Sequence, residues 1–348
     1  MRKLRFLSLI CVALFAAGVV SAQQSHRVVE YENTVTPKHS VRMSEGGIII
    51  VGKAPNARAM SGFSAKPSAA SACVDCCAFY RSQLGDSINI YLLAIPSANS
   101  FYMPTAARSW VRSEAEAINA IYASLDESIK IVDVYSALAQ HADEAIYSRT
   151  DHHWAPLGGY YAAQALAEVA ELPFNDLSHY EEVRVPNYVG SMYSFSNDKA
   201  VLYSPETFIY YKPLEIDYTT TYIKYSLASD HKTIVGTSRP QEGPFFYNYR
   251  GAGAYCNFMG SDSRITKVKT ATENGRRMLI VKDSFGNAIP GYLFYSFEEI
   301  HVVDFRFFNK NLKSYIESNS ITDVVLSTHI SFACSQSVMG KYKRLLVK

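Results

Sequence analysis

The sequence predicts an α/β protein, a three-layer sandwich whose sheet is mostly parallel and which carries an antiparallel β insertion. Strand-like and helical segments alternate before residue 174 and again after residue 276, whereas the stretch between them loses helical periodicity. Hydrophobic residues make up 48% of the 348 residues, which is enough for a large packed core.

The first 22 residues are predicted to be a signal peptide. Three basic residues, at positions 2, 3 and 5, precede an apolar run over 6–20 and a small-residue site that ends at Ala22. The alternative is a membrane anchor, but the run is shorter than the roughly 20 apolar residues that span a bilayer. We therefore expect export to the periplasm or the extracellular space, with no stable membrane anchor after cleavage.

Charge and cysteine content exclude other classes. The net charge of +2 becomes +2 − 3 = −1 without the signal peptide, which is not the balance of a nucleic-acid-binding protein. Five cysteines then remain, and Cys73-Val74-Asp75-Cys76-Cys77 could be half of a zinc site or a redox motif. Because no second CxxC or HxxxH completes a set of ligands, we interpret them as structural thiols.

The amino-terminal half supplies one βαβ unit. Residues 23–45 are polar and aperiodic and are expected to be flexible, so the folded domain is predicted to span 46–348 and to open with a strand over 46–52. A Ser/Ala-rich stretch, 61–72, is expected to be a loop. The apolar run 88–95 predicts a strand buried on both faces, Ser113-x-x-Glu116 a helix start, and 129–134 a second strand.

The sequence pattern in the middle of the chain changes from helical to alternating. A helix is expected from about Gly158 until Pro173 stops it. From about 180 to 258 the chain holds 12 of its 25 tyrosines among alternating, Thr-rich segments such as 219–225. This pattern predicts an antiparallel β insertion.

The last quarter returns to alternating strands and helices. A strand over 277–282 runs into Asp283-Ser284 and a predicted helix. Strands over 300–305 and 321–327 follow, separated by a helix over 312–318. With the strands near 88 and 129, this gives five strands for a mostly parallel sheet.

Ser284 is a candidate nucleophile because it follows the end of a predicted strand. The carboxyl ends of parallel strands gather at one edge of a sheet, where ligands bind. Gly286 permits a sharp turn, which would place backbone N–H groups beside the hydroxyl. The alternative is that Asp283 or Ser284 is only the cap of a helix.

Asp151-His152-His153-Trp154 is the second candidate element. In an extended segment Asp151 and His153 project to the same side, so the carboxylate could orient an imidazole that takes the proton of Ser284, while His152 points away. Two alternatives stay open. The segment could be a solvated surface loop, or Asp151, His152 and His153 could hold a metal ion.

The segment 150–154 resembles the motif that gives the DHHW family its name. Further patterns of that family follow its order: Ile95-Pro96-Ser97, Phe101-Tyr102-x-Pro104, Lys282-Asp283-Ser284-x-x-Asn287-Ala288, and a strand that leads to Arg306. The resemblance covers about 46–330 and extends more distantly to the SGNH-like catalytic domains of alginate O-acetyltransferases, where an Asp-x-His-Trp element also precedes the serine. It implies a flavodoxin-like, SGNH-type domain.

Carried over to this sequence, the resemblance makes Ser284 the nucleophile, His153 the base and Asp151 its orienting group. Asp283 stands next to the nucleophile as in a Gly-Asp-Ser block, but Lys282 replaces the glycine of such a block, which puts one oxyanion contribution in doubt.

Three further residues complete the predicted site: Gly286, Asn287 and Arg306. Asn287 would support the oxyanion hole, or else be a helix-surface amide. Arg306 would hold a sugar hydroxyl or a carboxylate, or else form a structural ion pair.

The resemblance implies an exported acyl-ester hydrolase or O-acetyltransferase that acts on a cell-envelope or extracellular carbohydrate. The expected partner is that carbohydrate or an acylated small molecule, and no nucleic acid, metal or cofactor is expected. The alternative is a non-catalytic glycan-binding or envelope assembly protein on the same fold.

Overall fold

The computed structural model describes residues 26–348. The predicted signal peptide, residues 1–22, lies outside the described residues. No helix in the described part of the chain is long and apolar enough to cross a membrane.

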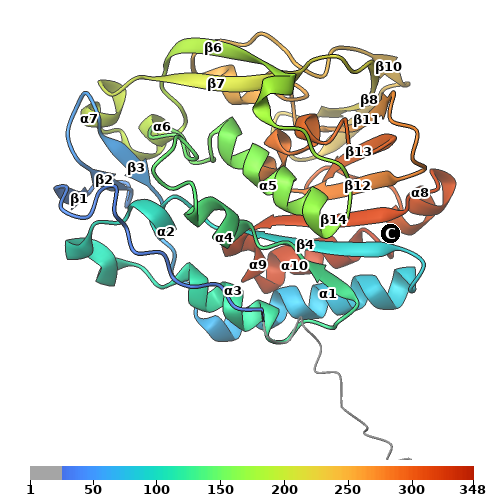
Figure 1. Ribbon diagram of the computed structural model, residues 1–348, viewed down its shortest axis with the longest axis horizontal. Coiled ribbons are helices and arrows are strands. Elements are labelled where there is room, and N and C mark those ends of the chain that lie inside the picture. Colours follow the sequence, from blue (N-terminus) through green and yellow to red (C-terminus); the bar gives the residue numbers. More distant parts are fainter. Residues whose placement is uncertain (1–25) are drawn as a thin grey trace, which may run out of the picture.

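One large sheet organises the domain (Figure 1). Its five parallel strands run side by side in the order β13-β12-β14-β4-β5. Their bounds are Glu299–Asp304 (β13), Arg277–Lys282 (β12), Asp323–His329 (β14), Asn89–Ile95 (β4) and Ile129–Ile131 (β5). These are the five predicted strands. Their nearly unbroken apolar runs are buried, as expected for strands covered on both faces.

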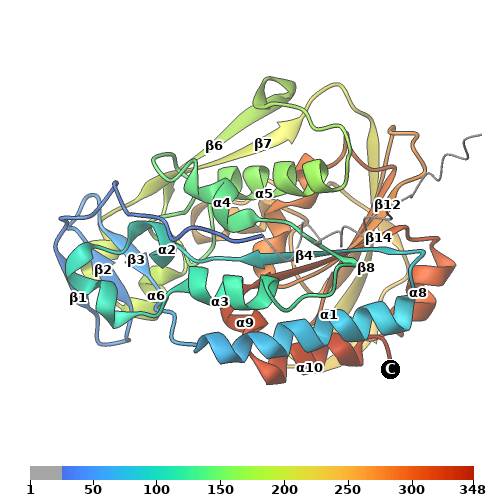
Figure 2. The ribbon, with the colours of Figure 1, turned by 60° about the horizontal axis from the view of Figure 1, so that its bottom comes forward.

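Helices cover both faces of the parallel strands, which confirms the three-layer α/β sandwich. Figure 2 shows α1 and α10 on one face and α4 and α5 on the other. The helices are α1 (Ser71–Leu84), α2 (Asn99–Tyr102), α3 (Glu114–Tyr122), α4 (Val134–Ala139), α5 (Pro156–Val169), α6 (Met192–Ser196), α7 (Lys199–Leu202), α8 (Leu312–Ser318), α9 (Ile330–Ala333) and α10 (Gln336–Arg344). The predicted cap of α3 is present, since the Ser113 side chain accepts a bond from the Glu116 N–H.

The stretch predicted as a loop over 61–72 ends in helix instead. A 3-10 turn, η2 (Pro67–Ala70), leads directly into α1. Cys73, Cys76, Cys77 and Tyr80 lie on the buried face of α1, at the spacing of one helical face. These thiols act as small core side chains, and burial raises the pKa of Cys76.

The tyrosine-rich segment is not wholly separate from the main sheet. β6 (Tyr180–Tyr188) and β7 (Glu206–Pro213) form a two-stranded sheet, but β8 (Tyr218–Leu227) and β10 (Gln241–Glu242) extend the large one. They join it through β11 (Arg264–Thr270), an antiparallel strand that the sequence analysis did not predict, and β9 (Ile234–Thr237) pairs with β8. This extension pairs the backbone groups that β13 would otherwise leave open at the edge.

The described part of the amino-terminal segment, expected to be flexible, packs on the domain. Val28 is buried, and its backbone exchanges two hydrogen bonds with the Asn119 side chain. β1 (Val41–Met43) pairs with β2 (Ile49–Val51), which pairs with β3 (Arg58–Met60). The polar composition of this segment did not predict these contacts, because they are made largely by backbone groups.

The chain after Ser284 also differs from its prediction. Two 3-10 turns, η6 (Ser284–Ala288) and η7 (Pro290–Tyr292), replace the expected helix. Pro290 has no N–H to donate to an earlier turn, which explains why a longer helix does not form. The other 3-10 turns among residues 26–348 are η3 (Thr105–Trp110), η4 (Leu177–His179) and η5 (Gly251–Asn257).

Candidate active site

Ser284 stands at the carboxyl end of β12, where Asp283 fixes the turn. One Asp283 carboxylate oxygen accepts the N–H of Phe285 at 2.9 Å, and the other accepts the N–H of His329 at 2.7 Å. These bonds cap η6 and tie the end of β12 to the end of β14. Asp283 is therefore the cap that the alternative interpretation proposed, and it leaves the Ser284 hydroxyl free for another contact.

That contact is with His153. Ser284 Oγ lies 2.8 Å from His153 Nε2, and His153 Nδ1 lies 2.7 Å from Asp151 Oδ1. Because a carboxylate can only accept, the complete set of bonds has Nδ1–H donating to Asp151 and the serine hydroxyl donating to Nε2. The structure thus brings together the three residues that the sequence analysis paired, in the order hydroxyl, imidazole, carboxylate.

Asp151 is buried and fully hydrogen-bonded. Oδ1 also accepts the backbone N–H of His153 at 2.9 Å, and Oδ2 accepts the N–H of Ser191 at 2.8 Å. Burial would raise the pKa of Asp151, but the hydrogen bond and charge of His153 outweigh it and hold that pKa well below the usual range. The carboxylate therefore stays ionised at neutral pH.

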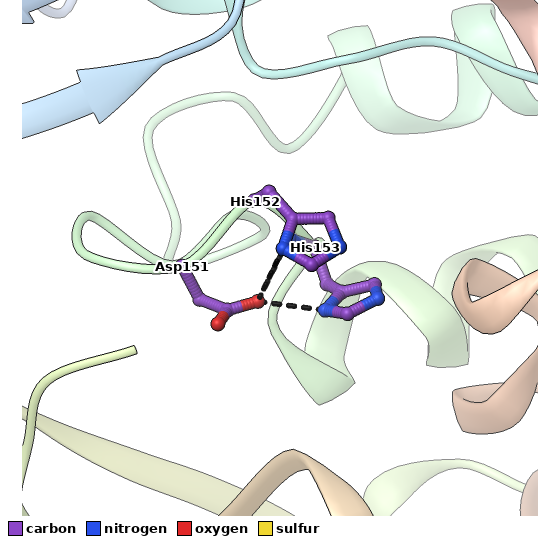
Figure 3. A group of neighbouring side chains, drawn as sticks. All are labelled: Asp151, His152 and His153. Carbon is purple, nitrogen blue, oxygen red and sulfur yellow. Dashed lines mark hydrogen bonds and ion pairs between the residues drawn. The ribbon is translucent and has the colours of Figure 1, made fainter. Parts of the chain in front are cut away.

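His152 does not point away from the site, so the expected geometry of this segment is wrong. Residues 151–153 form a bend rather than a strand, and the ring centroids of His152 and His153 are 3.7 Å apart. Figure 3 shows the two rings next to each other. His152 Nδ1 is 2.5 Å from Ser191 Oγ. Burial lowers the pKa of His152 to about 4, so this ring is uncharged at neutral pH.

The metal alternative meets a geometric difficulty. Asp151, His152 and His153 each offer a ligand atom, all within 4.8 Å of one another. Two ligands that are each about 2 Å from a tetrahedral zinc stand about 3.3 Å apart, whereas the Asp151 and His153 atoms are 2.7 Å apart and share a proton. A metal would have to break that bond, so the arrangement favours proton transfer.

The other predicted site residues have structural partners. The Asn287 amide donates to Asp262 at 2.9 Å, and the Gly286 N–H donates to the Asp283 carbonyl, so neither group is directed at Ser284. Gly286 is needed for space, since a Cβ there would lie 2.5 Å from the Lys282 Cβ. The Ser284 N–H has no hydrogen-bond partner among residues 26–348, which leaves it available as an oxyanion donor.

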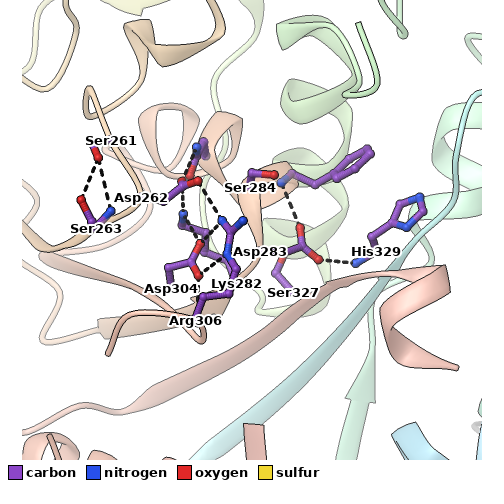
Figure 4. A network of polar contacts seen from close by, with 12 residues as sticks. Ser261, Asp262, Ser263, Lys282, Asp283, Ser284, Asp304, Arg306, Ser327 and His329 are labelled. Carbon is purple, nitrogen blue, oxygen red and sulfur yellow. Dashed lines mark hydrogen bonds and ion pairs between the residues drawn. The ribbon is translucent and has the colours of Figure 1, made fainter. Parts of the chain in front are cut away.

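Lys282 and Arg306 share two carboxylates beneath the site (Figure 4). Lys282 Nζ lies 2.7 Å from Asp262 and 3.0 Å from Asp304, and the Arg306 guanidinium contacts the same two residues at 2.8 and 2.7 Å. Burial would lower the pKa of Lys282, yet the two carboxylates raise it. Lys282 thus has a structural role, and Arg306 forms the ion pair that was one of its two predicted alternatives.

A cavity of about 200 Å³ opens beside Ser284. It is lined by polar groups of Ser61, Ser97, Asp151, His152, Ser284, Arg306 and His329, and by the apolar side chains of Met60, Ala98, Met192, Phe285 and Phe332. The cavity is small, so it fits a short acyl group or part of a larger substrate.

The sequence and this geometry agree with one known family. The family profile described as "DHHW protein" matches residues 30–303. The chain belongs to the DHHW family. A crystal structure of a DHHW family protein from Eubacterium siraeum is similar at 34% identity, with a TM-score of 0.76, over 88% of this chain and 97% of that one.

A more distant protein shares the fold of this DHHW protein. Bacillus cereus PatB1, in a structure with a sulfonyl adduct, is 18% identical with a TM-score of 0.62, over 84% of this chain and 96% of that one. The O-acetyltransferase domain of Pseudomonas putida AlgJ is 13% identical with a TM-score of 0.41, over 88% and 99% of the two chains. No curated protein matches the sequence.

Three residues of the DHHW protein's site were missed by the sequence analysis, and all come from the tyrosine-rich segment. Ser191 bonds Asp151 and His152, and Gly190 leaves no room for a Cβ, which would lie 2.4 Å from Asp151 Oδ2. Tyr255 stacks on His153, and its hydroxyl donates to the carbonyl of Ser284 at 2.9 Å. The abundance of tyrosine in this segment was a signal, but nothing in the pattern singled out Tyr255.

Proposed function

We propose that this DHHW protein is an acyl-transfer enzyme in which Ser284 is the nucleophile. The observation that carries the proposal is the continuous chain of hydrogen bonds from Ser284 through His153 to Asp151. Ser284 follows the end of the parallel strand β12, and Ser284 and Asp151 line a cavity of a size for a small substrate. The same arrangement of hydroxyl, imidazole and carboxylate activates a serine hydroxyl in proteins of unrelated folds.

The proposed reaction has two steps. Ser284 Oγ attacks the carbonyl carbon of an ester while its proton passes to His153 Nε2, and Asp151 stabilises the imidazolium that forms. The leaving alcohol takes that proton, and the acyl group stays on Ser284. In the second step water or an acceptor hydroxyl attacks the acyl carbon, its proton passes to His153, and Ser284 is released.

The Ser284 N–H would stabilise the oxyanion in both steps, because this N–H has no hydrogen-bond acceptor in the described part of the chain. Tyr255 and Trp154 hold the neighbouring backbone, since the hydroxyl of Tyr255 and the indole N–H of Trp154 donate to the carbonyl of Phe285 at 3.1 and 2.9 Å. These bonds support a fixed orientation of the donor.

We propose a carbohydrate ester outside the cytoplasm as the substrate. Two partly exposed aromatic side chains lie near the cavity: Phe332 in its wall and Phe195 with its ring 5.5 Å from that of His152. Their faces suit the apolar face of a sugar ring. The signal-peptide pattern that ends at Ala22 supports export.

Labelling with a sulfonyl fluoride or a fluorophosphonate tests the proposal. We expect stoichiometric modification of Ser284, seen by peptide mass spectrometry, and none in the His153→Ala or Ser284→Ala variants. Wild-type protein that stays unmodified near neutral pH would refute the enzyme and favour the alternative, a non-catalytic glycan-binding protein. Lys282, which put one oxyanion contribution in doubt, is explained by its ion pairs.

A further inference from the structure

We propose that His152 selects the acceptor of the acyl group, by donating a hydrogen bond to a second oxygen next to the attacking hydroxyl. The acceptor class is then a vicinal diol or polyol rather than a simple alcohol. The inference rests on the proposed function, and it concerns only the second step of that reaction.

Asp151 Oδ1, at 3.8 Å, is too far from His152 Nδ1 to accept a hydrogen bond, so the contacts of Ser191 indicate which nitrogen of His152 carries the proton. Ser191 Oγ accepts the backbone N–H of His152 at 3.3 Å and lies 2.5 Å from His152 Nδ1. If Nδ1 held the proton, Ser191 Oγ would accept twice and its own hydrogen would find no acceptor among the described residues. If the serine hydroxyl donates to Nδ1, every group is satisfied, and the ring hydrogen is on Nε2.

His152 Nε2 is left free to meet a ligand. It has no hydrogen-bond partner among residues 26–348 and is not a buried unsatisfied atom, and the side chain is 31% exposed in the cavity wall beside Ser284. Burial keeps the ring uncharged, with its pKa at about 4. An uncharged N–H donor suits a hydroxyl or ether oxygen of a substrate.

The position of the ring assigns that donor to the acceptor. The His152 and His153 rings are 3.7 Å apart, and His153 Nε2 takes the proton of whichever alcohol attacks or leaves. A donor on this side of Ser284 therefore lies next to the acceptor oxygen, while the oxyanion faces the Ser284 N–H. An oxygen on the adjacent carbon of the acceptor would be the group within reach of His152.

In the transfer step, one acceptor hydroxyl attacks the acyl carbon and loses its proton to His153, while the neighbouring oxygen accepts from His152 Nε2. The bond between the acyl carbon and Ser284 Oγ breaks, and the serine oxygen regains a proton from His153. No oxidant, reductant or metal takes part.

Acetyl transfer from p-nitrophenyl acetate to two matched alcohols tests this inference. Ethylene glycol and propan-1-ol differ by a hydroxyl in place of a methyl group. The measured quantity is the ratio of acetylated alcohol to free acetate for each alcohol, which compares fates of one acyl-enzyme and does not depend on how fast it forms. Because ethylene glycol has two equivalent hydroxyls and propan-1-ol has one, the two alcohols are compared per hydroxyl group. On that basis we expect the wild type to favour the diol by about two- to tenfold, the effect of one net hydrogen bond.

The variants separate a hydrogen bond from simple packing. His152→Phe should equalise the two alcohols, and Ser191→Ala should reduce the preference because the Nδ1 partner is gone. Ser194→Ala, which removes the neighbouring hydroxyl that donates to the Ser191 carbonyl at 2.7 Å, should retain it. A wild type with no preference for the diol, or a His152→Phe variant that keeps it, would overturn the inference. The proposed function would survive either result, provided that release of p-nitrophenol requires Ser284.

Discussion

Tyr255 lies flat against His153, with 3.9 Å between the ring centroids and 6° between the planes. Its hydroxyl donates at the same time to the carbonyl of Ser284. Tyr255, a side chain from the tyrosine-rich segment, thus contacts both the proposed base, His153, and the proposed nucleophile, Ser284. The segment that seemed appended in the sequence is part of the site.

The first prediction concerns this contact. Tyr255→Phe keeps the stacked ring and loses only the hydroxyl, so we expect kcat for a small acetyl ester to fall by about tenfold or less, the effect of a net hydrogen bond. Tyr255→Ala also frees the face of His153, and the expected loss is larger, on the order of 100-fold. Steady-state kinetics would measure both. Equal losses in the two variants would mean that stacking is unimportant.

The second prediction distinguishes the two adjacent histidines. His153→Ala should lower the rate of p-nitrophenol release from p-nitrophenyl acetate by about 10⁴-fold, because the base is gone. Asp151→Asn should also be severe, since an amide cannot stabilise the imidazolium. His152→Ala should cost about tenfold or less, because His152 does not contact Ser284. If both histidine variants lost equal activity and a divalent metal restored it, the metal interpretation would replace the triad.

The third prediction concerns the space beside Asp151. In Gly190→Ala the new Cβ would overlap Asp151 Oδ2, which must shift away from His153. We expect activity to fall by at least about 100-fold, since small displacements of aligned groups are costly. Gly253→Ala is the control, because its Cβ meets only an ordinary contact at 3.7 Å. Full activity in Gly190→Ala would show that the carboxylate position is not critical.

The fourth prediction concerns the buried ion pairs of Lys282. Lys282→Met leaves the buried Asp304 with one cation fewer, and we expect the free energy of unfolding to fall by about 3–5 kcal/mol. Lys267→Met is the matched control. Lys267 pairs with Glu299 at 2.8 Å but is 39% exposed, so about 1 kcal/mol or less is expected. Urea denaturation of the two variants would measure the difference, and similar losses would contradict the special role of Lys282.

The fifth prediction is a loss of stability in mild acid. Burial lowers the pKa of His329 to about 3, below its value of about 6.5 in an unfolded chain. The unfolded state therefore binds more protons between these values, and the free energy of unfolding falls as the pH falls, by up to about 1.4 kcal/mol per pH unit for this one group. His329→Asn, which can still cap α9, should flatten that slope when urea denaturation is repeated at stepped pH.

Asp283 provides the internal control, because its effect has the opposite sign. Burial raises the pKa of Asp283 to about 6, so protonation of this carboxylate stabilises the folded state as the pH falls from about 6 to 4. Asp283→Asn should therefore make the loss of stability in acid steeper. A shallower slope in that variant would contradict the assignment.

The sequence by itself determined the layers of the fold and the three central residues of the site. The apolar runs that became β4, β12, β13 and β14 are long enough to require burial on both faces, and that requirement predicts a parallel sheet covered by helices. Ser284 was identifiable because it follows such a strand, and Asp151 and His153 because a carboxylate beside an imidazole is chemically distinctive.

Only the tertiary structure decided how the triad is surrounded. The direction in which His152 points depends on a bend in the backbone, and hydrogen bonds to distant residues hold that bend. The Glu206 carboxylate, for example, accepts the backbone N–H groups of Arg149 and Thr150. The roles of Ser191 and Tyr255 likewise depend on packing between segments far apart in the chain. Local patterns predict which faces are buried, but they do not specify which distant backbone or ring meets a given side chain, because that depends on how the whole chain closes.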